Sequence, residues 1–426
     1  MTPHALLNAA LHDYHDRQNE LPLQIVKTKT HLAARGQTQS STSGRESFRR
    51  DIQGLRAIAV ILVIGNHAGI PGFAGGYIGV DVFFVISGYV ITNLLLRETA
   101  KGLRVGLADF YSRRIRRIVP AATATLIATM LIAEIMLGPR MNPQLPGDVR
   151  WASLFAANIR LITTGSNYFV PGISPSLITQ FWSLAVEEQF YLFFPIVIFL
   201  GARYVKMERR CAVLSIAIAM GIALSAWWSV QISAGEPTAA YYSPFTRFWE
   251  LGLGCLMATL TTGQATRTVR SEQIAVFLGV GLLATALVEL NSSSIYPGSL
   301  AWLPCASAAV FIWAGVTGPR TVLGKLLSNR ALGYVGDISY SLYLMHYVWL
   351  KLPGQLATPL TGWTWRTVEI AGTVVSAALS YHLLENPIRR SRRLANDRIA
   401  TALLLCVCIA TSWTVSIGVA RLAHLG

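Results

Sequence analysis

Residues 52–68, IQGLRAIAVILVIGNHA, form an apolar stretch with Arg56 near its start and His67 near its end. The stretch approaches the roughly 20 residues that a membrane-spanning helix needs. On an α-helix these two residues lie about three turns and about 16 Å apart, so their side chains leave the same face at two depths. Ionisable side chains inside a membrane are costly and mark functional sites. The stretch therefore predicts a membrane helix that carries a cation at one level and a titratable base at another.

The composition extends this prediction to the whole chain. Of the 426 residues, 53% are hydrophobic and only 13% are charged, and the mean hydropathy is +0.46. In soluble domains about a quarter of the residues are charged. We therefore expect an all-α, polytopic membrane helix bundle with about eleven transmembrane helices. Hydropathy places these helices at residues 52–69, 77–96, 118–138, 182–201, 211–231, 246–262, 274–290, 301–317, 334–352, 367–384 and 399–420.

The distribution of basic residues predicts the topology. The chain has 36 Lys and Arg against 21 Asp and Glu, a formal net charge of +15. With a cytoplasmic N-terminus, nearly every basic cluster falls in a cytoplasmic loop, for example 97–117 and 389–398, whereas outer connections such as 69–76 and 291–300 carry no Lys or Arg. We therefore expect a cytoplasmic N-terminus and a periplasmic C-terminus. Nucleic-acid binding is not expected, because the basic clusters sit between hydrophobic segments.

Two segments do not have the pattern of a membrane span. Residues 1–47 are polar with scattered histidines, which is typical of a flexible arm, and they lack the basic start and apolar core of a secretory signal. Residues 151–164 are apolar but short, and Asn158 and Arg160 interrupt them. Counting them as a span would place the later basic loops outside, so we interpret them as an interfacial or re-entrant piece.

All five cysteines fall in apolar segments, and none forms a CxxC pair or another metal-ligand spacing. They are Cys211, Cys255, Cys305, Cys406 and Cys408. We predict neither a metal site nor a disulfide framework, and we interpret these side chains as small buried hydrophobes.

Under this topology the polar residues inside the membrane separate into two levels. The outer level holds His67, Asp81, Glu187, Glu188, Arg247, Glu250 and His346. The inner level holds Arg56, the cluster Arg113, Arg114, Arg116 and Arg117, and Glu385 with Arg389 and Arg390. This separation predicts a reactive site at one face of the membrane and an anion-binding ring at the other.

His67 is the candidate base at the outer level. A neutral imidazole can take a proton from a hydroxyl near neutral pH, and a carboxylate such as Asp81 or Glu187 could orient it. The alternative is a histidine that only hydrogen-bonds to a neighbouring helix.

The arginines of the inner level also allow two interpretations. As a juxtamembrane cluster, Arg113 to Arg117 would fix the orientation of the chain or attract anionic lipid headgroups. Together with Arg56 they would hold the phosphates of a cytoplasmic anion.

Polar stripes with helical spacing predict which faces point inward. They are Ser183, Glu187 and Tyr191 in one segment and Ser339, Tyr343 and His346 in another. For Ser339, Tyr340, Ser341 and Tyr343 we favour helix packing over chemistry.

Six motifs carry a resemblance to a known family. They are FRRDIQGLRAIAVILVIGNHAGIPGFAGGYIGVDVFFVISGYVITNLLL at 48–96, FYSRRIRRIVP at 110–120, FWSLAVEEQFYLFFP at 181–195, RFWELGLG at 247–254, ISYSLYLMH at 338–346 and ENPIRR at 385–390. Together and in this order they resemble the membrane-bound acyltransferase 3 family, the O-acetylases of bacterial surface polysaccharides.

The resemblance implies an acyl-CoA-dependent O-acyltransferase of the bacterial inner membrane. It would transfer an acyl group, usually acetyl, from cytoplasmic acyl-CoA (acetyl-CoA) to a hydroxyl of a surface glycan such as lipopolysaccharide O-antigen or exopolysaccharide, or of its lipid-linked precursor. The family's motif residues correspond here to Arg56, His67, Arg114, Arg117 and Glu187, and less directly to Asp81, Tyr340, Ser341 and His346. We expect His67, Glu187 and Asp81 to be catalytic, and Arg56, Arg114 and Arg117 to bind the donor. Arg247 and Glu250, together with Tyr340, Ser341 and His346, are candidates for substrate or structural polar contacts.

The resemblance also divides the chain. We expect a cytoplasmic arm at 1–47, an acyltransferase membrane domain at 48–395, and an additional transmembrane helix with a short periplasmic tail at 396–426. Some relatives continue after such a helix into a periplasmic SGNH-type domain. A step that needs this domain would require a separate periplasmic partner or be dispensable.

Two alternatives to direct transfer remain open. One is a covalent acyl-enzyme intermediate on Ser87 or Ser341. The other is a membrane transporter in which the intramembrane His, Asp, Glu and Arg residues form a proton or anion pathway.

Overall fold

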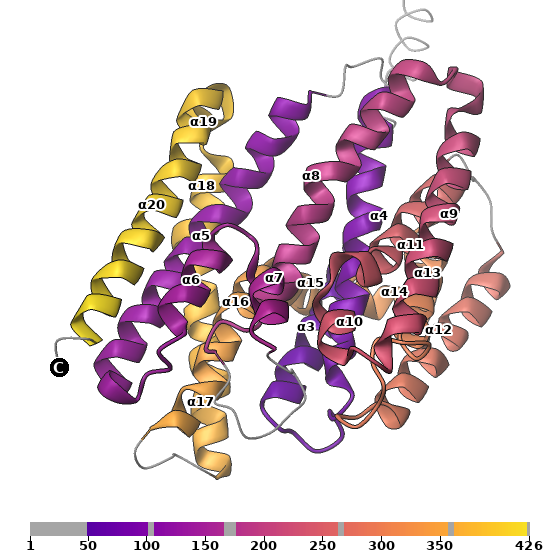
Figure 1. The fold of residues 1–426 in the computed structure, drawn as a ribbon. Helices are drawn as coiled ribbons and strands as arrows, with labels where there is room; N and C mark the ends of the chain where they lie inside the picture. The colour runs from indigo at the N-terminus through magenta and orange to yellow at the C-terminus, as the bar shows by residue number, and fades with distance from the viewer. Residues whose placement is uncertain (1–48, 101–105, 166–175, 263–267, 357–361, 424–426) are drawn as a thin grey trace, which may run out of the picture. The chain divides into compact units, whose positions relative to one another are not determined.

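The computed structural model describes residues 49–100, 106–165, 176–262, 268–356 and 362–423. The expected N-terminal arm at 1–47 and the last residues of the expected tail, 424–426, lie outside this part. Every element in the described ranges is a helix, so the predicted all-α class is confirmed (Figure 1).

Each of the eleven predicted spans overlaps a helix of the structure, and ten of them correspond to one main helix. These helices are α3 (Arg50–His67), α4 (Gly79–Ala100), α5 (Leu107–Leu137), α8 (Phe181–Tyr204), α9 (Met207–Ser233), α11 (Pro244–Thr261), α12 (Val269–Glu289), α13 (Trp302–Ala314), α16 (Ser339–Lys351), α17 (Trp363–Ser380) and α20 (Arg398–Ala423). In the described ranges, seven stretches are long and apolar enough to cross a membrane, and they include α4, α5, α8, α9, α12, α17 and α20. The chain is therefore a polytopic membrane protein, with shorter or more polar helices completing the bundle.

The structure corrects the span predicted at 334–352 and shows how the short apolar segment at 151–164 folds. The span predicted at 334–352 is broken at Ile338, where α15 (Arg330–Asp337) ends and α16 begins. The segment 151–164 falls in two helices of nine and seven residues, α6 (Leu145–Ser153) and α7 (Ala157–Thr163). Neither is long enough to cross a bilayer, in keeping with its exclusion from the spans.

The shorter elements connect the long helices. They are η1 (Gly76–Ile78), η2 (Gly138–Arg140), α10 (Pro237–Tyr242), α14 (Val322–Leu327), η3 (Pro353–Gln355), the π-helical turn η4 (Tyr381–Glu385), α18 (Asn386–Arg390) and α19 (Arg392–Asn396). The C-terminal helix α20 packs against α5 and α6 at one edge of the bundle (Figure 1).

Helix α3 is held by neighbours along its whole length. It packs against α4, α14, α15 and α16, and Ala57, Ala59, Val60 and Val63 are completely buried. This packing is what carries Arg56 and His67 into the interior of the bundle.

Helices α4 and α11 meet backbone to backbone. A Cβ atom on Gly88 would lie 1.9 Å from the carbonyl oxygen of Leu251, and one on Gly254 would lie 1.9 Å from the carbonyl oxygen of Val85. Small residues permit such close approach of membrane helices. The contact fixes Asp81 of α4 relative to Arg247 and Glu250 of α11.

Candidate active site

A cavity of about 100 Å³ lies between α3, α4, α5, α8 and α16. Its lining contains charged, hydroxyl-bearing and aromatic side chains. The lining residues are Arg56, Phe83, Phe84, Ile86, Ser87, Val90, Arg114, Arg117, Ile118, Ser183, Leu184, Glu187, Tyr191, Ser339, Tyr340 and Tyr343. Both predicted inward stripes therefore reach this cavity.

Three arginines gather at the cavity. Arg56 comes from α3, and Arg114 and Arg117 come from successive turns of α5. The guanidinium carbon of Arg114 lies 3.6 Å from the centroid of the Tyr191 ring, a cation–π contact. Arg56 Nη1 donates to Gln53 Oε1 at 3.3 Å. All three side chains keep part of their surface accessible, so they can bind an anion that enters the cavity.

The other two arginines of the α5 cluster make different contacts. Arg113 Nη2 forms an exposed ion pair with Glu98 at 2.7 Å. Arg116 is buried and donates from Nε to the carbonyl of Ser112 at 3.2 Å. Arg114 and Arg117, three residues apart on α5, thus share the helix face that lines the cavity, whereas Arg113 and Arg116 lie on another face.

Glu187 belongs to the cavity wall. It accepts a hydrogen bond from Ser87 Oγ at 2.6 Å and another from the Tyr191 hydroxyl.

Tyr340 and Ser341 lie near the same wall but point in different directions. The Tyr340 hydroxyl donates to the carbonyl of Ile118 at 2.8 Å while its side chain lines the cavity. Ser341 Oγ donates to Glu385 Oε2 at 2.9 Å and does not line the cavity. Ser341 therefore joins α16 to η4.

His67 and His346 are in direct contact. The distance from His346 Nε2 to His67 Nδ1 is 3.0 Å, and His346 Nδ1 lies 2.7 Å from the carbonyl oxygen of Tyr343. Lys351 Nζ donates to the backbone carbonyl of His67 at 3.3 Å, and the Tyr347 ring meets the His67 ring edge-on. The sequence placed both histidines at the outer level, and this common depth was the only signal of their contact.

Tyr343 connects the histidine pair to the cavity. Its side chain lines the cavity, and its hydroxyl lies 2.5 Å from Ser183 Oγ and donates to the Gln180 carbonyl at 3.0 Å. Its backbone carbonyl contacts His346. One residue therefore separates the arginine-lined cavity from the histidines.

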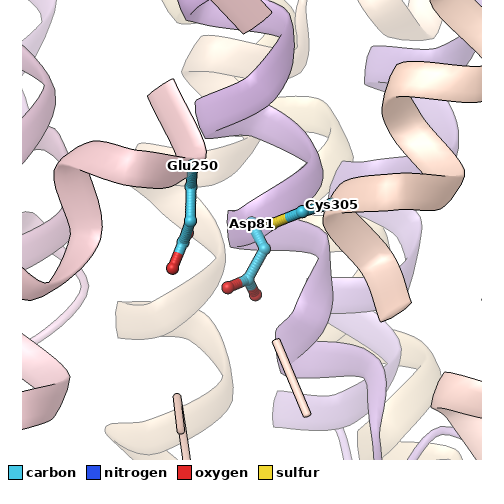
Figure 2. A group of neighbouring side chains, drawn as sticks. All are labelled: Asp81, Glu250 and Cys305. Carbon is cyan, nitrogen blue, oxygen red and sulfur yellow. The ribbon is translucent and has the colours of Figure 1, made fainter. Parts of the chain in front are cut away.

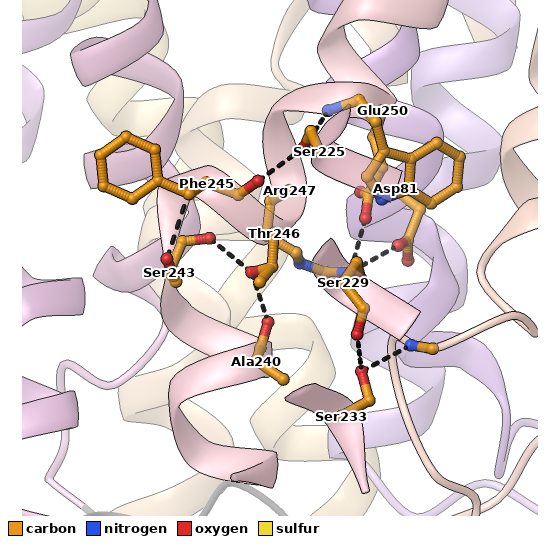
Figure 3. A network of polar contacts seen from close by, with 12 residues as sticks. Asp81, Ser225, Ser229, Ser233, Ala240, Ser243, Phe245, Thr246, Arg247 and Glu250 are labelled. Atoms are coloured by element: carbon orange, nitrogen blue, oxygen red, sulfur yellow. Dashed lines mark hydrogen bonds and ion pairs between the residues drawn. The ribbon is translucent and has the colours of Figure 1, made fainter. Parts of the chain in front are cut away.

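Asp81, Arg247 and Glu250 form a second polar cluster. Arg247 Nη1 lies 3.1 Å from Asp81 Oδ1 and 2.6 Å from Glu250 Oε1, and all three residues are completely buried (Figure 3). Aromatic rings surround the guanidinium, with the centroids of Trp182, Tyr241 and Tyr296 at 5.2–5.5 Å from its carbon. The carboxylates predicted to orient His67 have other partners, since Asp81 pairs with Arg247 and Glu187 bonds to Ser87 and Tyr191. His346 lies at hydrogen-bond distance from the His67 ring instead.

Cys305 lies beside this cluster. One potential ligand atom each of Asp81, Glu250 and Cys305 falls within 4.8 Å of the others (Figure 2). The guanidinium of Arg247, however, already lies against both carboxylates and would repel a metal cation. Arg247 thus supplies the positive charge of this group itself.

Comparisons with known proteins agree with this architecture. A family profile described as an acyltransferase domain matches residues 49–385. The peptidoglycan O-acetyltransferase OatA of Listeria monocytogenes is 32% identical over 350 residues, which are 80% of this chain and 56% of that protein. The O-acetyltransferase OatA of Staphylococcus aureus is 33% identical over 355 residues, 80% of this chain and 57% of that protein.

A third relative, the putative peptidoglycan O-acetyltransferase YrhL of Bacillus subtilis, is 32% identical over 353 residues, 79% of this chain and 54% of that protein. The chain thus spans about half the length of these relatives. No solved structure matches it. Because the family profile covers most of the chain, the chain belongs to this acyltransferase family, and the resemblance drawn from the six motifs is confirmed.

Proposed function

We propose that this member of the acyltransferase family transfers an acyl group, acetyl in the simplest case, from acyl-CoA to a hydroxyl of a cell-surface glycan. The observation that carries the proposal is the gathering of Arg56, Arg114 and Arg117 from two helices around one cavity. Guanidinium groups bind phosphates through paired, charge-assisted hydrogen bonds, and CoA is rich in phosphates. A cavity of about 100 Å³ holds only part of this donor.

The histidine pair would carry the chemistry. As the acceptor hydroxyl attacks the thioester carbonyl, its proton goes to His67 and a tetrahedral intermediate forms. When the carbon–sulfur bond breaks, the CoA thiolate leaves and takes the proton from the His67 imidazolium. The products are the O-acyl ester and CoA, and no covalent enzyme intermediate is needed.

The placement of the two centres fits a reaction across a membrane. Arg56 is the seventh residue of α3 and His67 is the last, about three turns further along the helix. With the N-terminus in the cytoplasm, as the basic loops indicate, the arginines face the compartment of acyl-CoA and His67 faces the periplasm of the inner membrane. The pantetheine arm of the donor would span the distance between them.

We propose the chemical class of the acyl acceptor and not one particular glycan. Two of the relatives are named peptidoglycan O-acetyltransferases, which favours a surface glycan or its lipid-linked precursor. Peptidoglycan, O-antigen and exopolysaccharide all offer such hydroxyls.

The test is transfer of labelled acetyl from acetyl-CoA by the purified protein in liposomes. We expect His67→Ala to lower the rate by about 10²- to 10⁴-fold, the range of general base catalysis. Full activity of His67→Ala would reject the assignment. NMR of ester signals on surface glycans from strains with and without the gene identifies the acceptor.

Two further arms of the experiment address the alternatives. Label retained on the protein without an acceptor, at Ser87 or Ser341, would establish a covalent intermediate. Uptake of the donor into liposomes without ester formation would support a transporter.

A further inference from the structure

We propose that His346 is a positioning residue that holds His67 with its hydrogen on Nδ1, so that Nε2 is the atom that takes the acceptor proton. The statement about Nδ1 stands on contacts alone. The statement about the acceptor proton rests on the proposed function.

The first step is the state of His346. Its Nδ1 lies 2.7 Å from the Tyr343 carbonyl oxygen, and a carbonyl oxygen can only accept a hydrogen bond. Nδ1 of His346 therefore carries a hydrogen. A second hydrogen would place a charge in a completely buried ring, close to the ammonium of Lys351 that bonds to the His67 carbonyl. His346 is thus neutral, and its Nε2 is an acceptor.

The second step follows at His67. The 3.0 Å between His346 Nε2 and His67 Nδ1 is a hydrogen-bond distance, and one of the two nitrogens must donate. Since His346 Nε2 has no hydrogen, His67 Nδ1 donates. A neutral imidazole carries one hydrogen, so the lone pair that can act as a base lies on Nε2 of His67.

The third step is what holds His346 Nε2, the hydrogen-bond acceptor, in place. Tyr343 is held to α8 through its hydroxyl by Ser183 and Gln180, and Gln180 Nε2 also donates to the Leu344 carbonyl at 3.0 Å. Helix α8 therefore holds the turn of α16 that contains the Tyr343 carbonyl. This carbonyl keeps the hydrogen of His346 on Nδ1. His346 lies beside His67 in the position where many hydrolases and transferases have an acidic residue that orients the catalytic histidine.

The test is nitrogen-15 NMR of histidine-labelled full-length protein in lipid, with His67 assigned by its loss in His67→Asn. We expect the wild-type His67 to carry its hydrogen on Nδ1. His346→Leu removes the hydrogen-bond acceptor of His67 Nδ1, so the form of His67 that carries its hydrogen on Nε2 should appear. In His346→Gln the amide oxygen can accept from Nδ1, so the wild-type state should largely return. A hydrogen on Nε2 of wild-type His67, for instance toward the Val63 backbone with which this ring also bonds, would overturn the proposal.

Kinetics of the same variants provide the second readout. We expect kcat of His346→Leu to fall by about 100-fold with an unchanged KM for acetyl-CoA, and His346→Gln to recover part of kcat. The control is His382→Gln, which changes a histidine bonded to Tyr334 on another helix and should leave both constants unchanged. Equal kcat in His346→Leu and wild type would overturn the positioning role. If the Nδ1 state is observed but no variant or wild type transfers acetyl, the proposed function fails and the positioning contact stands.

Discussion

Two regions of this molecule place arginine next to carboxylate among membrane helices, and they differ in what surrounds the charges. The lining of the cavity includes three arginines, Arg56, Arg114 and Arg117, but one carboxylate, Glu187, and these arginines keep accessible surface. In the buried cluster of Asp81, Arg247 and Glu250, the guanidinium lies between two carboxylates and aromatic rings, and nothing is exposed. In this protein, the charged side chains that line a cavity are therefore the candidates for binding a ligand. The charged side chains of the buried cluster join α4 to α11.

The largest expected effect comes from opening the buried cluster. Arg247→Met leaves two carboxylates buried without their cation and should destabilise the protein by about 3–5 kcal/mol, measured as thermal unfolding in detergent. The matched control is the triple variant Asp81→Asn, Glu250→Gln and Arg247→Met, which removes all the charges and should recover much of the loss. A stable but inactive Arg247→Met protein would show that this cluster takes part in transfer.

The next effect concerns the cavity arginines. Arg114→Gln and Arg117→Gln should fold normally and raise the KM for acetyl-CoA by about 10- to 100-fold each, because a hydrogen bond to a charged group contributes about 1.5–3 kcal/mol. Arg113→Gln is the control on the same helix, since its exposed pair with Glu98 contributes little. Equal effects of all three variants would point to membrane orientation as the role of the whole cluster.

A smaller effect of definite sign is expected at Glu187. Its carboxylate competes with donor phosphates for the cavity arginines, so Glu187→Gln should lower the KM for acetyl-CoA by about threefold. The glutamine oxygen can still accept from Ser87 and Tyr191, which keeps the wall intact. A kcat reduced to the level of His67→Ala would instead make Glu187 catalytic, as the motif resemblance implies.

The smallest effect is expected at Cys305. Because Arg247 supplies the positive charge beside it, Cys305→Ala should change the stability by about 1 kcal/mol or less, and a chelator should leave the unfolding temperature unchanged. A loss as large as that of Arg247→Met would identify a metal site in this cluster.

The helices follow from local hydropathy, since each of the eleven predicted spans overlaps a helix, although one span is broken in two. Arg114 and Arg117 were singled out by the motif resemblance and not by their spacing, because Arg113 and Arg116 are also three residues apart. The break at Ile338 was missed because hydropathy averaged over 334–352 passes over the local helix-ending signal of Gly336 and Asp337.

The partners of the polar residues could not be predicted in the same way. Depth alone made Asp81 and Glu187 equally suitable neighbours of His67, yet a ring nitrogen at hydrogen-bond distance from it belongs to His346, 279 positions further along the chain. Asp81 pairs with Arg247, 166 positions away. Such choices depend on how the helices rotate and cross, which side-chain packing over the whole bundle decides.

The backbone contact between α4 and α11 has a mechanical consequence. With Gly88 and Gly254 each against a carbonyl of the opposite helix, these two helices have no side-chain layer at this crossing that could be compressed or slide. We expect this half of the bundle to behave as a rigid frame. An entrance wide enough for a donor larger than the resting cavity must then form by displacement of α5, α8 or α16, so cross-links between α4 and α11 should be harmless, whereas cross-links between α8 and α16 should arrest turnover.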